Sequence, residues 1–381
     1  MMSDSTSRFI QMWRGIAVAL VVLYHFLSRV PHEALGSAEA PILQLQIGKV
    51  GVLIFFVISG YLITKSLAKT TDVAEFYAKR IARIWPLFIV AAITVFVFIH
   101  FAQPPVVPGP HSFFEKQPTA FDLIGNLFFL EDLGFTWVDG AYWSIVVELK
   151  FYLFIGLFAV AFKERFIQMF CLVALSVSSV DLFILLVDRA PGIPLDFDSS
   201  NHLRVLSKAM HGIFISQYLP FFALGVAMAG RMQDGVFNAL LALAVAFSVM
   251  AINDDSFVFD QNVQFLFILA ATLLADKLLF KSGVIVWIGD YSYSIYLFHQ
   301  VVGLSLIKLF TPIIGIDLAI AASLALVIAI AWIASNLFEM RYRRVVAAQL
   351  YRVFSMVGLN RLTFDFRNEM PFVGEALSRK A

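Results

Sequence analysis

The chain has 381 residues, of which 60% are hydrophobic, 14% are charged and 40 are Phe, and its mean hydropathy is +0.83. Soluble domains carry about 25% charged residues, so this composition excludes an ordinary soluble protein and predicts an integral membrane protein. The net charge of +1 gives no reason to expect a nucleic-acid partner, and the single cysteine, Cys171, excludes an intrachain disulfide, a four-cysteine zinc site and an iron–sulfur cluster.

Apolar stretches of about 20 residues predict an all-α polytopic membrane protein with about ten transmembrane helices. The stretches cover residues 9–29, 47–67, 84–102, 143–162, 166–187, 212–230, 236–252, 263–280, 284–310 and 313–338. A shorter apolar run at 122–130 is expected at the membrane interface. Residues 1–340 are expected to form one transmembrane domain, and residues 341–381 a basic cytoplasmic tail.

The distribution of basic residues predicts the orientation in the membrane. When the N-terminus is placed in the cytoplasm, most of the 28 Lys and Arg residues fall on the cytoplasmic side, eight of them in the tail from Arg341 onward. This asymmetry is what the positive-inside rule expects. An even number of spans then places both termini in the cytoplasm.

The first apolar stretch contains two ionisable residues, Arg14 and His25. Eleven helical steps come within about 20° of whole turns, so both side chains share one helix face, roughly 16 Å apart along the axis. Ionisable groups at membrane depth are costly and usually functional. The alternative is an Arg that snorkels to the interface and a His bonded to a neighbouring helix.

The connection after the second stretch carries Lys79, Arg80 and Arg83, which we call the cytoplasmic fork, followed by Trp85. Arg80 and Arg83 share a helical face, and guanidinium groups bind phosphate through bidentate charge-assisted bonds. The alternative is a topology anchor that contacts lipid headgroups. The fork lies on the same side of the membrane as Arg14, which favours a functional role.

The fourth stretch carries a polar stripe of Ser144, Glu148 and Tyr152 at intervals of four residues, beginning beside Trp143. Such a stripe faces protein or water rather than lipid.

The ninth stretch repeats this arrangement, because Ser292, Tyr296 and His299 share one helix face. For both stripes the alternative is interhelical hydrogen bonding that only fixes packing. Three further histidines, His111, His202 and His211, lie in predicted outer loops with no metal-site spacing, so no metal is expected.

Taken together, these motifs resemble the acyltransferase-3 family of membrane O-acyltransferases over roughly residues 8–340. The motifs are Arg14 and His25 in the first span; Phe55-Phe-Val-Ile-Ser-Gly-Tyr-Leu in the second; Arg80-x-x-Arg83 followed by Trp85-Pro86; Tyr142-Trp-Ser-x-x-x-Glu148 with Phe151-Tyr152; and Ser292-Tyr-Ser-x-Tyr-Leu-x-His299. Five short motifs in order form a specific signal.

The resemblance implies a multi-pass enzyme of the bacterial cytoplasmic (inner) membrane, surrounded by membrane lipids. It would transfer an acyl group, with acetyl expected, from cytoplasmic acyl-CoA to a hydroxyl of an extracytoplasmic glycan or lipid-linked glycan. No bound cofactor is expected, and acyl-CoA (acetyl-CoA) is the co-substrate.

The same reasoning assigns roles within the site. The fork and Arg14 would bind acyl-CoA, His25 would act as general base or as an acylated nucleophile, and Glu148 would orient His25 or hold the sugar. Four further residues are expected to bind the acceptor or to serve as structural polar groups: Trp143, Ser144, Tyr296 and His299.

Two other functions are consistent with the same residues. The acceptor could be a small secondary metabolite or a lipid instead of a glycan. In a different class, a transporter or flippase could use Arg14, His25 and Glu148 as a substrate or proton path.

Overall fold

A computed structural model describes residues 4–29, 48–102, 117–189, 197–232, 235–250 and 283–364. Within these ranges the chain is all-α, and its one β-type contact is an isolated antiparallel bridge between Asp72 and Thr363. The predicted fold class is therefore confirmed.

The helices follow one another in chain order with few connecting residues. They are α1 (Asp4–Tyr24), α2 (Gly48–Leu67), α3 (Val73–Ala102), α4 (Ala120–Leu127), α5 (Trp143–Phe162), α6 (Phe166–Arg189), α7 (Phe197–Phe214), α8 (Leu219–Gly230), α9 (Gly235–Met250), α11 (Gly283–Asp290), α12 (Ser292–Phe298), α13 (Val301–Ile314), α14 (Ile316–Ala334) and α15 (Met340–Met356). Short 3-10 turns are η3 (Glu131–Leu133), η4 (Gly140–Tyr142), η5 (Lys163–Arg165) and η7 (Leu359–Arg361), and π-helical turns are η1 (His25–Arg29) and η6 (Ser335–Glu339).

Among the described residues, six helical segments are long and apolar enough to cross a membrane, or seven if the bent pair α12 and α13 forms one span. The six are Thr6–Ser28, Val50–Leu67, Val73–Phe101, Gly140–Val187, Val205–Gly230 and Ile316–Met356, and the fourth contains both α5 and α6. The apolar part of α9 is shorter, and the predicted span 263–280 lies outside the described residues. The chain is a multi-pass membrane protein, and the count of ten spans stays a prediction.

The predicted continuous span 284–310 is wrong in detail, because the structure has three helices there, α11, α12 and α13, with a 59° bend between the last two. The buried carboxylate of Asp139 explains how this bend is stabilised. It accepts a hydrogen bond of 3.2 Å from the backbone N–H of Val301, the first residue of α13. The amide at the break is therefore satisfied without a continuous helix.

The region predicted as an outer loop, 188–211, also differs, since most of it belongs to helix α7. A buried carboxylate holds this helix against α6. Asp181 accepts hydrogen bonds from Ser207 and Ser216, and the ring of His211 lies 2.8 Å from it. His211 is therefore a helix residue with a carboxylate partner.

Glycine allows α2 and α8 to pack in direct contact. A Cβ atom on Gly225 would lie 2.0 Å from the carbonyl oxygen of Val57, and one on Gly60 would lie 2.1 Å from that of Phe222. Small residues that bring backbones close together are the usual basis of helix association in membranes. This pair fixes α2, which carries part of the cavity described below.

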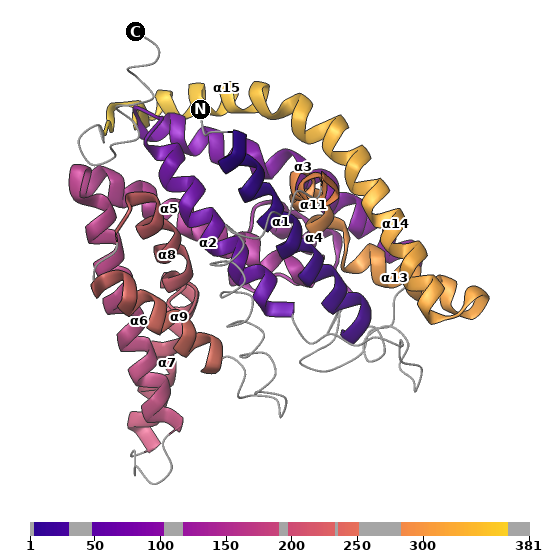
Figure 1. The fold of residues 1–381 in the computed structure, drawn as a ribbon, viewed down its shortest axis with the longest axis horizontal. Helices are drawn as coiled ribbons and strands as arrows, with labels where there is room; N and C mark the ends of the chain where they lie inside the picture. Colours follow the sequence, from indigo (N-terminus) through magenta and orange to yellow (C-terminus); the bar gives the residue numbers. More distant parts are fainter. Residues whose placement is uncertain are drawn as a thin grey trace.

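Helix α15 lies along the edge of the molecule at which α1 begins (Figure 1). The connection between α2 and α3 is joined to the same region, because Val73 N–H donates to the Leu362 carbonyl and Phe364 N–H donates to that of Thr71. From this edge α1 runs to the opposite side of the molecule (Figure 1). The two ends of α1 therefore lie on different sides.

Candidate functional site

A cavity lies between α1, α2, α3, α5 and α12. Its polar lining consists of Arg14, Ser59, Arg83, Ser144, Glu148, Tyr152, Ser292, Tyr293 and Tyr296, and its apolar lining includes Val52, Phe55, Phe56 and Leu62. Each of the five sequence motifs contributes at least one residue. Motifs separated by nearly 280 residues in the chain therefore meet around one space.

Glu148 lies at the centre of the hydrogen bonds within the cavity. Its carboxylate accepts a bond of 2.7 Å from the Ser59 hydroxyl and another from the Tyr152 hydroxyl. These bonds connect α5 to α2 and hold the carboxylate in place. The ring orientation of His25, which we expected Glu148 to set, is instead supported by a backbone carbonyl described below.

Two guanidinium groups, of Arg14 and Arg83, line the same cavity. Arg14 donates a bond of 3.1 Å to the side chain of Gln11. Arg83 interacts electrostatically with Glu148 and Glu339, but no described residue accepts a hydrogen bond from it. A guanidinium has five N–H donors, so most donors of this pair are available to an anion in the cavity.

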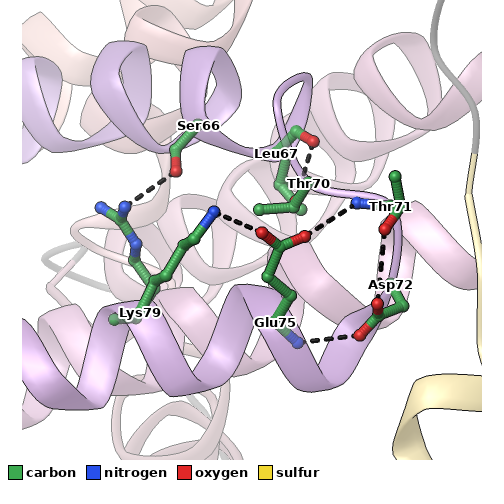
Figure 2. Close-up of polar contacts among 8 residues, drawn as sticks. Ser66, Leu67, Thr70, Thr71, Asp72, Glu75 and Lys79 are labelled. Atoms are coloured by element: carbon green, nitrogen blue, oxygen red, sulfur yellow. Dashed lines mark hydrogen bonds and ion pairs between the residues drawn. The ribbon is translucent and has the colours of Figure 1, made fainter. Parts of the chain in front are cut away.

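The cytoplasmic fork is divided by the fold, because only Arg83 reaches the cavity. Arg80 is 7% exposed and donates a bond of 2.8 Å to the Ser66 hydroxyl. Lys79 lies on a more exposed side of α3 and forms an ion pair of 2.6 Å with Glu75 (Figure 2). Sequence spacing predicted one shared cationic surface, whereas neighbouring helices separate its three members.

Ser144 and Tyr296 join α5 to α12 at the cavity wall. Their hydroxyl oxygens are 2.7 Å apart, and that of Tyr296 also donates a bond of 2.8 Å to the Ala141 carbonyl. Trp143 does not line the cavity, but its ring packs against Phe56, which does. The two predicted stripes therefore face each other.

His25 lies beyond this wall, at the first residue of the π-turn η1. Its Nδ1 atom is 2.9 Å from the Val21 carbonyl oxygen, and its ring centroid is 4.8 Å from that of His299. The ring of His299 in turn lies 5.3 Å from that of Tyr296. Tyr296 thus contacts both the cavity and the histidine pair.

Sequence reasoning missed two residues of this region, Ser59 and Asp139. Ser59 stands within the second motif, which indicated the family but not this contact. Asp139 is fully buried, and burial raises its pKa to about 7, although its hydrogen bonds from Ala141 and Val301 act in the opposite direction. The sequence signal was an Asp directly before an apolar helix, which is typical of an N-cap.

Comparison with known proteins agrees with the motifs. A family profile described as an acyltransferase domain matches residues 7–336. Acyltransferase MdmB of Streptomyces mycarofaciens is 24% identical over 299 residues, which cover 71% of each chain. Peptidoglycan O-acetyltransferase OatA of Listeria monocytogenes serovar 1/2a is 24% identical over 331 residues, 80% of this chain and 50% of the relative. The chain therefore spans about half the length of the listerial relative. No solved structure matches.

Proposed function

The chain belongs to the acyltransferase family whose profile covers residues 7–336, and we propose that it transfers an acetyl group from cytoplasmic acetyl-CoA to a hydroxyl of an extracytoplasmic glycan. Family membership and the apolar helices make it a membrane O-acyltransferase. They favour an enzyme over the transporter that the same ionisable residues would also suit.

The observation that carries the donor assignment is the pair of guanidinium groups in the cavity. Glu148 is the one carboxylate in the lining, and it already has two hydroxyl partners. Buried cations with unfilled donors are costly unless an anion completes them. We therefore assign Arg14 and Arg83 to the phosphates of acyl-CoA. The contributions of Arg80 and Lys79 to the same phosphates stay predictions.

The length of α1 fits the length of the donor. Arg14 and His25 are roughly 16 Å apart along the helix, which is of the order of an extended pantetheine arm. The nucleotide can then stay at the Arg14 end, while the thioester reaches Tyr296 and the histidine pair. This separation suits a donor and an acceptor that enter from opposite faces.

His25 has the geometry of a general base. A carbonyl oxygen only accepts, so the contact with Val21 assigns the ring proton to Nδ1 and makes Nε2 the basic atom. Nε2 would take the hydroxyl proton as the new C–O bond forms. The C–S bond then breaks, and the CoA thiolate receives that proton. An acyl-histidine intermediate would use the same Nε2 atom.

The remaining roles follow from position. Trp143, Ser144 and Tyr296 lie between the two ends and are candidates for acceptor binding. Both termini, with the edge that carries α15, are placed on the cytoplasmic side of the bacterial inner membrane. No bound cofactor is needed by this mechanism, and membrane lipids, donor and glycan are the partners.

The proposal is tested by comparing a strain that lacks the gene with strains expressing the wild type or Arg83→Ala. Alkali-labile acetate is measured in the glycan, lipid and small-molecule fractions. We expect wild-type protein alone to restore acetate in the glycan fraction. Acetate restored only in another fraction would replace the glycan acceptor with a lipid or a small metabolite. If no fraction gains acetate, transfer of acetyl is refuted.

A further inference from the structure

A second histidine, His299, lies against the proposed base. The rings of His25 and His299 meet edge to face, with centroids 4.8 Å apart and planes 82° apart. His25 is 9% exposed and His299 is fully buried. Both stand where a regular helix is interrupted, one at the start of η1 and the other at the bend between α12 and α13.

The fold holds these two interruptions together from two directions. A Cβ atom on Gly303 of α13 would lie 2.3 Å from the ring of Phe26, the neighbour of His25. Asp139 accepts from the N–H of Val301, two residues after His299. The position of His299 relative to His25 is therefore fixed by packing and by a buried cap.

The hydrogen bonds of His299 leave one ring nitrogen without a partner. Its Nδ1 atom is 2.7 Å from the Tyr296 carbonyl oxygen, so Nδ1 carries the proton and Nε2 holds a lone pair. No described residue donates to this fully buried Nε2 atom. A buried acceptor without a donor costs roughly 1–3 kcal/mol. If the ring served only for packing, phenylalanine would fill the space without that cost.

We propose that His299 is a positioning residue for the acyl transfer, in which its Nε2 atom accepts a hydrogen bond from His25 after His25 has taken the hydroxyl proton. This rests on the proposed function. In the resting state neither Nε2 atom carries a proton, so the bond cannot form. Protonation of His25 supplies the missing donor, and centroids at 4.8 Å bring the ring nitrogens within reach after a small rotation. The proton then passes to the CoA thiolate, and His299 gains none.

Three substitutions separate this role from a structural one. His299→Gln keeps a polar group near the Nε2 position, with an amide oxygen that can accept. His299→Asn keeps a donor near the Nδ1 position, which can still bond the Tyr296 carbonyl. His299→Phe keeps the ring and loses both nitrogens.

The measurement uses membrane vesicles from strains expressing the full chain, given radiolabelled acetyl-CoA. Incorporation of label into the membrane and glycan material is followed as the acetyl-CoA concentration is varied. We expect His299→Phe and His299→Asn to lower the maximal rate about ten- to hundredfold, the loss expected for one charge-assisted hydrogen bond. The apparent KM for acetyl-CoA should not change. His299→Gln should retain most of the activity.

Other outcomes have distinct meanings. Full activity in His299→Asn with loss in His299→Gln would show that only the bond to Tyr296 matters, which overturns the proposal. Equal loss in all three variants with lower abundance in the membrane would also overturn it in favour of a structural role. If wild-type vesicles incorporate no label above vesicles lacking the protein, the proposed function itself fails.

Discussion

At the scale of single residues, the site combines buried cations that lack sufficient partners with a carboxylate that has them. Glu148 has hydroxyl donors from two helices, whereas Arg83 has no hydrogen-bonding acceptor among the described residues. Because the cost of an incomplete cation is high in a membrane-embedded cavity, this imbalance marks where an anionic ligand binds. His25 lies outside this charged region, where its basicity does not depend on a printed carboxylate contact.

Replacement of His25 by alanine should abolish acetyl transfer without preventing insertion, because the ring acts on the reacting hydroxyl. Loss of a general base lowers the rate by about 10² to 10⁴-fold. The measurement is alkali-labile acetate in cells matched for protein abundance. His100→Ala is the matched control, since the exposed His100 makes the same contact with the carbonyl four residues earlier. Normal acetate in His25→Ala cells would refute the catalytic assignment.

Replacement of Arg83 by lysine should weaken CoA binding by on the order of tenfold, because lysine keeps the charge but loses the planar bidentate fork. Calorimetric titration of the purified full chain with CoA measures this change. Lys79→Ala is the control, because Lys79 is paired with Glu75 away from the cavity. We expect the effect of Arg80→Lys to lie between the two. Equal affinities for wild type and the Arg80→Ala/Arg83→Ala double variant would leave only the topology-anchor interpretation.

At the scale of elements, the site depends on helices that are interrupted or unusually close. The bend between α12 and α13 places His299 beside η1, and Asp139 satisfies the first amide of α13. The contact of α2 with α8 holds Ser59 at the cavity. Both features can be tested through stability rather than activity.

Asp139 should make stability depend on pH. Burial raises its pKa from the ordinary value near 4 to about 7. A raised carboxyl pKa stabilises the folded state fully at low pH, and that contribution is lost as pH rises toward 7. The melting temperature of wild type, relative to Asp139→Asn, should therefore fall between pH 5 and pH 7 and level off above it. A difference that stays constant across this range would mean that Asp139 remains ionised throughout.

Gly225 tests the contact between α2 and α8. A valine side chain there would collide with the backbone of Val57 and Tyr61, so the helices must separate. We expect Gly225→Val to lower stability by about 1–3 kcal/mol or more, seen as a lower melting temperature in detergent. Gly212→Ala is the control, because a Cβ there meets nothing within 4 Å. Equal melting temperatures for the two variants would contradict this packing.

At the scale of the whole molecule, α1 begins at the edge that carries α15 and ends on the other side (Figure 1). No residue of α15 is buried, and the helix presents Arg341, Arg343, Arg344 and Arg352 beside exposed apolar side chains such as Val345 and Val353. A basic amphipathic helix of this kind suits an anionic membrane surface, at roughly 1 kcal/mol per basic residue close to it. The cytoplasmic placement of this edge stays a prediction.

Reporter fusions test the orientation on which the donor assignment depends. A reporter active only in the periplasm should be silent when fused after Ala381. The same reporter should be active when inserted between Arg189 and Phe197, where α6 ends and α7 begins. The opposite pattern would place Arg83 away from cytoplasmic acyl-CoA, and the donor would have to be a different molecule.

The sequence by itself determined the class of the protein, because hydropathy and motif order are local properties. Sixty per cent hydrophobic residues and apolar stretches predict a helical membrane protein, and five motifs indicated the family that the profile match confirms. The length of α1 and the membership of Arg14, Arg83, Glu148, Ser144 and Tyr296 in one region also followed from spacing and the shared polar faces.

Only the tertiary structure decided which of these residues meet. Periodicity gives the face of a helix but not its neighbour, so the separation of Lys79 and Arg80 from the cavity was not visible in the sequence. The bend after α12 depends on Asp139, more than 150 residues away in the chain. The contact of His25 with His299 arises from two helix interruptions packed together, and no local pattern encodes that juxtaposition.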